Sequence, residues 1–412
     1  MSSPDPPHRR GPRPLLLHLG LAAMRTNSAL ASSIGALLNL KSASPRSSDG
    51  RAEAERILAA LAGGQGVFPE AVLQEAIGRD AALIAGIAAY RRDSYRRELS
   101  DPPVIWQEGE SRLLDFGGSG PVVLFVPSLV NRAYILDLAS GASFMRYLAG
   151  RGVRPLLLDW SWPDEAARRF TMTDYVAGRL ERAMQAVAGP VVLAGYCMGG
   201  LLALAAALRQ PRLVSALALF ATPWDFHAAD PGGAQRLAQA LPLLEPMLAA
   251  GGTLPIDALQ SLFTMIDPFG VGEKYRGFAG LDPACARARR FVALEDWLND
   301  GVPLAAAVAR ETLAGWYGQN SPARLQWRIA GLAVDPRDFA KPSFVAIPAR
   351  DRLVPPQSAR ALADMLPAVT VHEPQAGHIG MVAGTTAEAL LWQPFLDWVL
   401  RVSQQGRKVG GA

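Results

Sequence analysis

Short apolar segments alternate with helical segments in the second and last thirds of the chain, and this alternation limits the possible folds more than any other feature. Helical patterns occupy residues 174–187 and 201–209, for example, and lie between apolar runs. The runs expected to form strands are bounded by turn residues and cover 122–126, 153–159, 191–194, 216–220, 344–347 and 369–372. Because buried parallel strands are apolar throughout and need helical crossovers, the pattern predicts an α/β fold with a mostly parallel central sheet covered by helices on both faces.

The alternation is interrupted from residue 224 to residue 335. This stretch is rich in proline and glycine, contains helix-like pieces and shows no clear strand. An insertion of this length between two strands predicts a helical cap, or lid, over the edge of the sheet. Residues 101–223 and 336–403 would then form the core of the fold.

The segment GYCMGG, residues 195–200, places Cys197 between a predicted strand and a predicted helix. This context is typical of a nucleophile elbow, where the central residue is strained and its side chain is exposed. Gly195 and Gly199 avoid clashes in the tight turn, and Gly200 lets the helix pack closely. A buried, inert cysteine is the alternative, but the strand before it and the helix after it favour a nucleophile.

An acid and a histidine follow Cys197 in the order that such folds use. Asp351 comes just after the strand expected at 344–347, and His378 lies in a loop after the strand at 369–372. A large insertion before the acid and a short gap to the histidine fit a capped α/β-hydrolase fold. His378 would take the proton of the Cys197 thiol, while the Asp351 carboxylate would hold the imidazole in place. Taken singly, Asp351 could equally be a turn cap and His378 an ordinary loop residue; the order of the three residues together favours the triad.

Further side chains are candidates for the walls of the cleft. The backbone amides of Met198 and Leu129 are candidates for an oxyanion hole, and Asn131 and Arg132 for substrate binding. Loop packing is the alternative for Leu129, Asn131 and Arg132. Trp224 is a candidate for substrate binding in an apolar channel, with core packing as the alternative. Five more cap aromatic residues share that expectation: Phe226, Phe263, Phe269, Phe278 and Trp297.

The basic charge of the chain is concentrated at its N-terminus. Residues 1–46 carry six arginines and lysines and one aspartate, whereas the remainder carries 35 basic and 36 acidic residues, the totals being 41 and 37. No basic stripe for nucleic acid is therefore expected on the folded body. Residues 1–50 are interpreted as a basic, disordered or amphipathic leader, with an interfacial segment and a signal peptide as alternatives. Residues 51–100 form a region of helical pattern.

Cysteine and histidine usage limits the compartment and the cofactors. The two cysteines, Cys197 and Cys285, give no disulfide framework and suit a reducing compartment such as the cytoplasm. Because no cysteine and histidine cluster has the spacing of metal ligands, no metal site is expected. No apolar run reaches the roughly 18 residues needed to span a bilayer.

Four segments together resemble the polyhydroxyalkanoate synthases, the cysteine branch of the α/β-hydrolases. They are FVPSLVNRAYILDL, GYCMGG, ARDRLVPP and GHIGMV, and the likeness runs from about residue 122 to residue 399. The resemblance implies that Cys197 is the nucleophile, Asp351 the acid and His378 the base. It also implies an acyltransferase that polymerises (R)-3-hydroxyacyl-CoA into polyester and releases CoA, with the coenzyme A thioester as substrate and no cofactor.

Residues 291–320 are similar to the short catalytic subunit of the two-subunit class of these synthases. That likeness implies a second, non-catalytic subunit. The chain departs from the class by carrying roughly 100 residues before the core, so a homodimer stays open as well. The expected location is the cytoplasm, with peripheral attachment to polymer granules.

A thiol nucleophile suits this chemistry, because acyl transfer between two thioesters is nearly balanced in energy and keeps the acyl group activated. Two other functions stay open on the sequence alone. The first is a hydrolase with the same triad, either an intracellular depolymerase or an acyl-CoA thioesterase. The second is a non-catalytic, granule-associated protein. Exclusion of water by the cap would separate a polymerase from a hydrolase.

Overall fold

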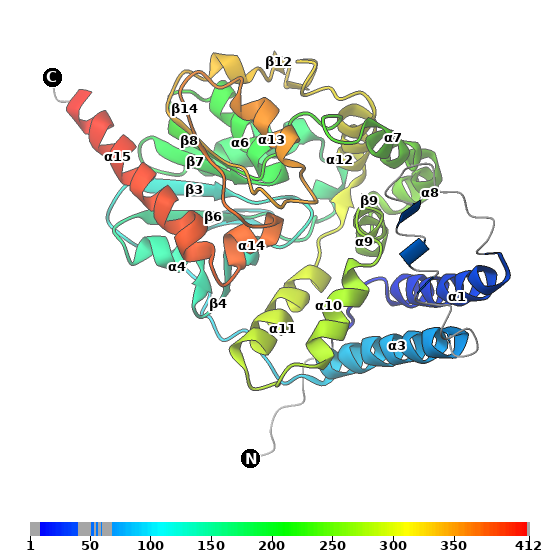
Figure 1. Cartoon of the computed structure of the whole chain (residues 1–412). Helices are drawn as coiled ribbons and strands as arrows, with labels where there is room; N and C mark the ends of the chain where they lie inside the picture. Colours follow the sequence, from blue (N-terminus) through cyan, green and yellow to red (C-terminus); the bar gives the residue numbers. More distant parts are fainter. Residues whose placement is uncertain (1–8, 40–50, 53–54, 57–58, 60–67, 410–412) are drawn as a thin grey trace. The chain divides into compact units, whose positions relative to one another are not determined.

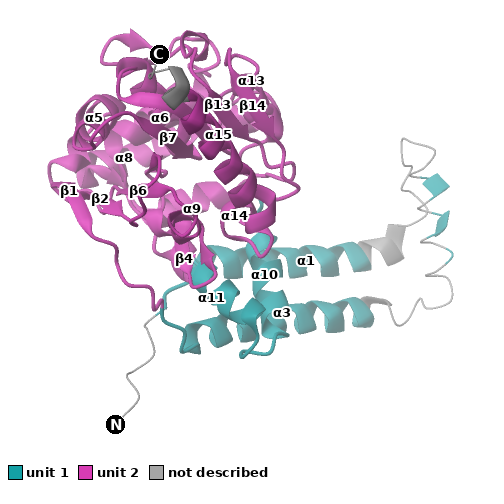
Figure 2. Cartoon of the chain, turned by 90° about the vertical axis from the view of Figure 1, so that its left-hand side faces the viewer, with its two compact units in different colours: residues 1–96, 267–295 teal, residues 97–266, 296–412 magenta. Residues whose placement is uncertain are grey.

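A computed structural model describes residues 9–39, 51–52, 55–56, 59 and 68–409 of the 412-residue chain. The chain divides into two compact units, which are coloured separately in Figure 2. Unit 1 comprises residues 1–96 and 267–295, and unit 2 comprises residues 97–266 and 296–412. The predicted cap, residues 224–335, is therefore shared between the two units, because its middle part packs with the N-terminal helices.

Unit 2 is built on an eight-stranded sheet with the order β1-β2-β6-β3-β7-β8-β13-β14 (Figure 1). The six strands from β6 to β14 run parallel, while β2 pairs antiparallel with both β1 and β6. The predicted α/β-hydrolase fold with a mostly parallel sheet is thus confirmed. The strands are β1 (Val104–Glu108), β2 (Ser111–Asp115), β3 (Val122–Val126), β6 (Arg154–Asp159), β7 (Val191–Tyr196), β8 (Val214–Phe220), β13 (Ser343–Ala346) and β14 (Val369–His372).

Helices cover the sheet of unit 2, and several of them lie in segments where the sequence predicts helix. The segment 174–187 is a π-helix, η3 (Asp174–Leu180), followed by α5 (Glu181–Gln185), and the segment 201–209 belongs to α6 (Met198–Arg209). Elements that flank the sheet are η1 (Ala133–Leu136), β4 (Asp137–Ala139), β5 (Ala142–Ser143), α4 (Phe144–Ala149), η2 (Ala167–Arg169), η5 (Pro336–Asp338), α13 (Pro356–Ala363), α14 (His378–Ala383), η6 (Glu388–Trp392) and α15 (Gln393–Val409).

The cap segments that belong to unit 2 are mainly helical. Two-residue strands occur there as well, although the sequence shows no clear strand in this stretch. These elements are α7 (Pro231–Gln239), α8 (Leu241–Gly251), β9 (Thr253–Leu254), α9 (Ile256–Thr264), β10 (Leu304–Ala305), α12 (Ala306–Arg310), η4 (Glu311–Gly318), β11 (Arg328–Ile329) and β12 (Leu332–Ala333).

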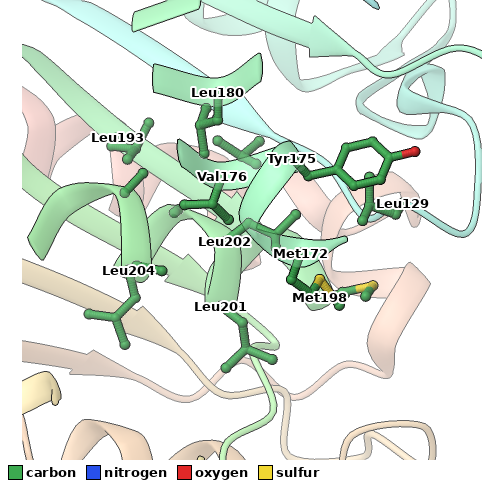
Figure 3. Close-up of a cluster of buried hydrophobic side chains, with 14 of the residues drawn as sticks. Leu129, Met172, Tyr175, Val176, Leu180, Leu193, Met198, Leu201, Leu202 and Leu204 are labelled. Carbon is green, nitrogen blue, oxygen red and sulfur yellow. The ribbon is translucent and has the colours of Figure 1, made fainter. Parts of the chain in front are cut away.

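The apolar core of unit 2 fixes the position of α6 on the sheet. Leu201, Leu202 and Leu204 of α6 are completely buried, and they gather with Leu193 of β7 and Val176 of η3 in one cluster (Figure 3). A buried leucine side chain contributes roughly 1.5–3 kcal/mol relative to an exposed one. The first turn of α6, which follows Cys197, is therefore held rigidly against the ends of the strands.

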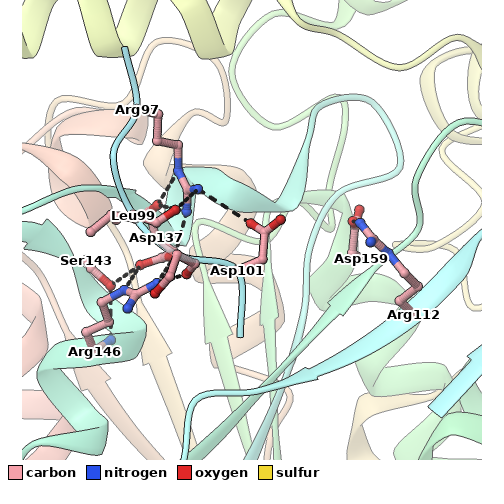
Figure 4. Close-up of polar contacts among 9 residues, drawn as sticks. Arg97, Leu99, Asp101, Arg112, Asp137, Ser143, Arg146 and Asp159 are labelled. Carbon is pink, nitrogen blue, oxygen red and sulfur yellow. Dashed lines mark hydrogen bonds and ion pairs between the residues drawn. The ribbon is translucent and has the colours of Figure 1, made fainter. Parts of the chain in front are cut away.

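A buried carboxylate anchors the chain that follows β3. Asp137 is 2% exposed, and it accepts hydrogen bonds from Arg97 at 2.6 Å, from Ser143 at 2.6 Å and from Arg146 at 2.8 Å (Figure 4). Two guanidinium groups around one carboxylate offset the cost of burying its charge. This network fixes the C-terminal end of the loop that carries Asn131.

Unit 1 is a cluster of helices made from two distant parts of the sequence. Its core combines Leu83 and Tyr90 of α3 with Tyr275 and Phe278 of α10 and Val292 of α11. Its elements are α1 (Leu15–Asn39), α3 (Phe68–Arg92), α10 (Gly270–Ala279) and most of α11 (Ala286–Asn299).

The region interpreted as a leader is helical over Leu15–Asn39, so the expectation of disorder does not apply to that part. Residues 1–8 and 40–50 lie outside the described residues. In the parts of the chain that the structure describes, no helix combines the length and the apolar character needed to cross a membrane.

Candidate active site

Cys197 occupies the sharp turn between β7 and α6. Its backbone angles are φ 57° and ψ −129°, a conformation that L-residues with a side chain rarely adopt. Its backbone N–H donates to the carbonyl oxygen of Phe220 on β8 at 2.8 Å, which fixes the turn to the sheet. The strain at this residue is typical of functional positions, where the surrounding structure over-determines one conformation.

The glycines around Cys197 are required by close approach. A Cβ atom on Gly195 would lie 2.4 Å from Gly200 Cα, and one on Gly200 would lie 1.8 Å from Thr222 Oγ1. A Cβ atom on Gly199 would lie 2.1 Å from the carbonyl oxygen of Val126 at the end of β3. The start of α6 is therefore pressed against the ends of two strands.

Asp351 and His378 form a tight pair. Asp351 follows β13, His378 opens α14, and His378 Nδ1 donates to Asp351 Oδ2 at 2.7 Å. The other carboxylate oxygen of Asp351 accepts the backbone N–H groups of Leu353 and Val354, both at 2.9 Å. Because Nδ1 is engaged and the carboxylate is fixed, Nε2 is the imidazole nitrogen available to another group.

That group is Cys197, whose side chain lies close enough to His378 to act on the pKa of the imidazole. Burial opposes the charged imidazolium, but the negative charge of Cys197 and the hydrogen bonds from Asp351 and Cys197 outweigh it, and together they raise the pKa of His378 to about 10. The raised pKa of His378 therefore favours the imidazolium form beside the cysteine sulfur. A thiolate is the reactive form of a cysteine nucleophile.

A cavity of about 520 Å³ contains Cys197 and His378 on its wall. The loop after β3, the helices α7 and α9, the π-helix η4 and the segment after Asp351 all contribute to it. Most of the lining is apolar, and its large members are Val130, Phe226, Leu262, Phe263, Trp297 and Trp316. The shape and lining suit an acyl group near the sulfur.

Comparison with known proteins places this site in a family. The model of the alpha/beta hydrolase family matches residues 123–390. The Poly(3-hydroxyalkanoate) polymerase subunit PhaC of Synechocystis sp. is 30% identical over 291 residues, which cover 67% of this chain and 77% of that protein. The chain belongs to the poly(3-hydroxyalkanoate) polymerase subunits of the alpha/beta hydrolase family. The family predicted from the four sequence segments is thereby confirmed.

Two further likenesses give the extent of the match. The subunit PhaC of Haloferax mediterranei is 28% identical over 319 residues, and the match spans 74% of this chain and 64% of the length of that relative. Among solved structures, a monoacylglycerol lipase of Paleococcus ferrophilus is 14% identical, with a TM-score of 0.46, and the match covers 71% of this chain and 100% of the lipase.

The other predicted site residues of this polymerase-family chain lie at different depths. Asn131, Arg132 and Met198 line the cavity, whereas Leu129 is buried beside it with 4% of its surface exposed. The oxyanion hole formed by the amides of Met198 and Leu129 stays a prediction. Its geometry is favourable in one respect, because the close approach of Gly199 to β3 brings the first turn of α6 against the loop that carries Leu129.

Trp224 requires a correction. The sequence suggests that it lines an apolar channel, but the structure buries it completely in the core, and the cavity wall is formed by its neighbours Pro223, Asp225 and Phe226. Its backbone N–H donates to Ser358 Oγ at 3.1 Å, which holds the segment after β8 against α13. The structure therefore supports the alternative interpretation, in which Trp224 packs in the core.

The other predicted aromatic residues divide between the two units. Phe226, Phe263 and Trp297 line the cavity. Phe269 and Phe278 belong to unit 1 and are absent from the lining. The sequence could not separate the two groups, because both lie in the same helix-rich insertion.

Two tyrosines near the triad were missed by sequence reasoning. The ring of Tyr196 lies 5.1 Å from the imidazole of His378, and its hydroxyl donates to the carbonyl oxygen of that residue at 3.2 Å. Tyr317 lines the cavity, and burial together with the charge of Cys197 raises its pKa to about 12, so its hydroxyl stays protonated as a donor. The only signals for them were position: Tyr196 precedes Cys197, and Tyr317 lies in the segment similar to the short catalytic subunits.

Arg132 brings a charged side chain to the cavity wall. Its Nε lies 3.9 Å from Asp300 Oδ2, and its carbonyl oxygen accepts the indole N–H of Trp297 at 2.7 Å. In the described ranges, no group of three or more histidine, cysteine, aspartate or glutamate side chains is placed to hold a metal ion.

Proposed function

We propose that this chain is an acyltransferase that polymerises 3-hydroxyacyl groups from coenzyme A thioesters, with Cys197 carrying the acyl group as a thioester. The observation that carries the proposal is the position of Cys197: it lies at a strained elbow, and it shares the wall of a mostly apolar cavity with His378. Membership of the polymerase subunits gives the substrate class.

In the first step, Cys197 Sγ attacks the thioester carbonyl carbon of the hydroxyacyl-CoA. The carbonyl oxygen becomes an oxyanion, for which the amide of Met198 at the start of α6 is a candidate donor. The intermediate then collapses, the bond to the CoA sulfur breaks, and His378 gives its proton to the departing thiolate. Free CoA leaves and a hydroxyacyl-cysteine thioester stays behind.

In the second step, the 3-hydroxyl oxygen of another hydroxyacyl unit attacks that thioester carbonyl. His378, now neutral, takes the hydroxyl proton, and Asp351 stabilises the imidazolium that forms. The bond to Cys197 Sγ breaks and an oxygen ester joins the two units. The thiolate and imidazolium are thereby restored without any redox change.

Exclusion of water decides whether the acyl-cysteine is elongated or hydrolysed. Apolar side chains from α9 and η4 line the cavity that also contains the sulfur, and apolar walls disfavour bound water. This lining favours attack by a bound hydroxyl over attack by a water molecule.

The test is incubation of the purified protein with 3-hydroxybutyryl-CoA. We expect free CoA together with polymer, and we expect Cys197→Ser to abolish polymer formation while leaving the fold intact. Free CoA with free 3-hydroxybutyrate would instead indicate a hydrolase, and an absence of CoA release would indicate a non-catalytic protein. Full activity of Cys197→Ser would contradict the thioester route.

We also propose that the chain acts with a partner polypeptide, in the cytoplasm and on polymer granules. The naming of the relatives as subunits supports a partner. Co-purification from the source cell under mild conditions would identify it, and a homodimer alone in that preparation would refute the second subunit. Fractionation of the same cells would test association with granules.

A further inference from the structure

Asn131 differs from Thr312 and Gln260, two neutral polar side chains on the same cavity wall. The hydroxyl of Thr312 donates to Val308 O and Ala309 O of its own helix, both at 2.9 Å, and the amide of Gln260 donates to Leu298 O at 3.1 Å. By contrast, Oδ1 of Asn131 is buried and has no hydrogen-bond partner among the described residues. It is an unused acceptor on the wall that also carries the nucleophile.

The backbone around Asn131 is held firmly, so the unused acceptor is not the result of a loose loop. Asn131 forms an antiparallel bridge with Gly301, and the N–H of Val302 donates to Val130 O at 3.0 Å. On its other side, the carbonyl oxygen of Arg132 accepts the indole N–H of Trp297 at 2.7 Å. Unit 2 thus fixes this residue from both directions.

A buried acceptor without a donor is costly, and native proteins leave few of them. The substrate class of the proposed function brings a matching donor, because each hydroxyacyl unit carries a hydroxyl group into a mostly apolar space. A hydroxyl buried there without an acceptor is itself unfavourable. The unused acceptor of Asn131 and the hydroxyl donor of the substrate would therefore satisfy each other.

We propose that Asn131 Oδ1 accepts a hydrogen bond from the 3-hydroxyl group of the bound hydroxyacyl unit, and that this contact makes the site select 3-hydroxyacyl over unsubstituted acyl thioesters. The inference rests on the proposed function. A site that hydrogen-bonds a substrate hydroxyl discriminates strongly against the analogue that lacks it, since the buried polar group of the protein is then left unpaired.

The experiment compares two substrates that differ only in this hydroxyl. Single-turnover CoA release is measured with 3-hydroxybutyryl-CoA and with butyryl-CoA, for the wild-type chain and for Asn131→Leu. We expect the wild type to prefer the hydroxylated substrate, and Asn131→Leu to reduce that preference by about ten- to 100-fold, the range for a lost neutral hydrogen bond that leaves a buried group unpaired. Asn131→Asp keeps an acceptor oxygen and should keep the preference.

Thr312→Val is the matched control, because it removes a polar group from the same wall whose hydroxyl is already bonded within its own helix. Its ratio of the two rates should equal that of the wild type. Equal losses with both substrates in Asn131→Leu would overturn the proposal and point to a group that they share, such as a pantetheine amide. An unchanged ratio would overturn it as well.

Asn131→Ala provides a second variant in case the leucine does not fold, as judged by its melting temperature. Failure of the proposed function is a separate outcome: the wild type would then release no CoA from 3-hydroxybutyryl-CoA.

Discussion

Gly199 offers the sharpest test of how the elbow is built. In Gly199→Ala the new Cβ would lie 2.1 Å from Val126 O and 2.6 Å from Pro127 O, both of them backbone atoms. Real Cβ contacts are essentially never below 3.0 Å, so α6 and the end of β3 must separate by about 0.9 Å, from 2.1 to 3.0 Å. Neither side can yield by rotating a side chain.

Two effects of that separation can be measured. Forced repacking of a dense core costs typically 1–3 kcal/mol, so we expect a lower melting temperature. The turn that holds Cys197 would also shift relative to His378 and the loop after β3, and a misplacement of about 1 Å is enough to lower a rate by about 100-fold. We therefore expect Gly199→Ala to lose CoA release from 3-hydroxybutyryl-CoA by about two orders of magnitude while the protein stays folded.

Gly277→Ala on α10 is the control for this change. A Cβ atom there would meet nothing within 4 Å, and alanine in a helix interior is favoured over glycine by roughly 0.5–1 kcal/mol. This variant should melt at the same or a slightly higher temperature. Wild-type rate and stability in Gly199→Ala would refute the packing argument, because the elbow would then have room that the structure does not show.

Other predictions concern the triad and the core. Asp351→Asn should lower the rate of CoA release by about 100-fold or more, because it removes the charge that holds and stabilises the imidazolium of His378. Single-turnover kinetics would measure this rate, and a near-normal rate would mean that Asp351 is dispensable. The imidazole of His378 should stay protonated to about pH 10 by NMR, and in Cys197→Ala it should titrate at a lower pH, since burial still opposes the charge while the favourable interaction with Cys197 is gone. Because the pKa of His378 is raised above the ordinary 6.5, its protonation stabilises the folded protein fully below about pH 6.5, and this contribution is lost as the pH rises through 10. If His378 titrated at the same pH in the wild type and in Cys197→Ala, the interaction between Cys197 and His378 would be contradicted. Trp224→Phe should cost about 1–3 kcal/mol of stability, seen in urea unfolding, and leave the KM for 3-hydroxybutyryl-CoA unchanged; a raised KM would restore Trp224 to the substrate site.

The sequence predicts well that the three candidate triad residues come together, because their signals are local and ordered. Cys197, Asp351 and His378 each follow a recognisable strand, and parallel strands end at the same edge of a sheet. The sequence does not predict which side chains face the cavity. Whether Trp224 or Phe226 faces the cavity depends on how η4 and α13 pack, and no short stretch of sequence records that packing.

Two further features of the fold, the β1–β2 hairpin and the division into two units, could not be predicted from the sequence. The strands β1 and β2 form a hairpin at the sheet edge, where charged side chains such as Arg112 pair with Asp159 and mask the apolar alternation. The division of the chain into two units depends on contacts between α3 and α10, which lie far apart in the sequence. Gly86 marks one such contact, since a Cβ atom on it would lie 2.0 Å from Tyr275 O.

The composition of unit 1 has a consequence during synthesis. Its N-terminal helices leave the ribosome first, but the residues that complete their core, 267–295, follow only after the 170 residues from 97 to 266 have been made. At about 5–20 residues per second, that delay is roughly 10–30 s. Throughout it the core residues of α3, such as Leu83 and Tyr90, lack the partners that α10 and α11 will supply, so the newborn protein must remain soluble, or be shielded by a chaperone, until these helices emerge.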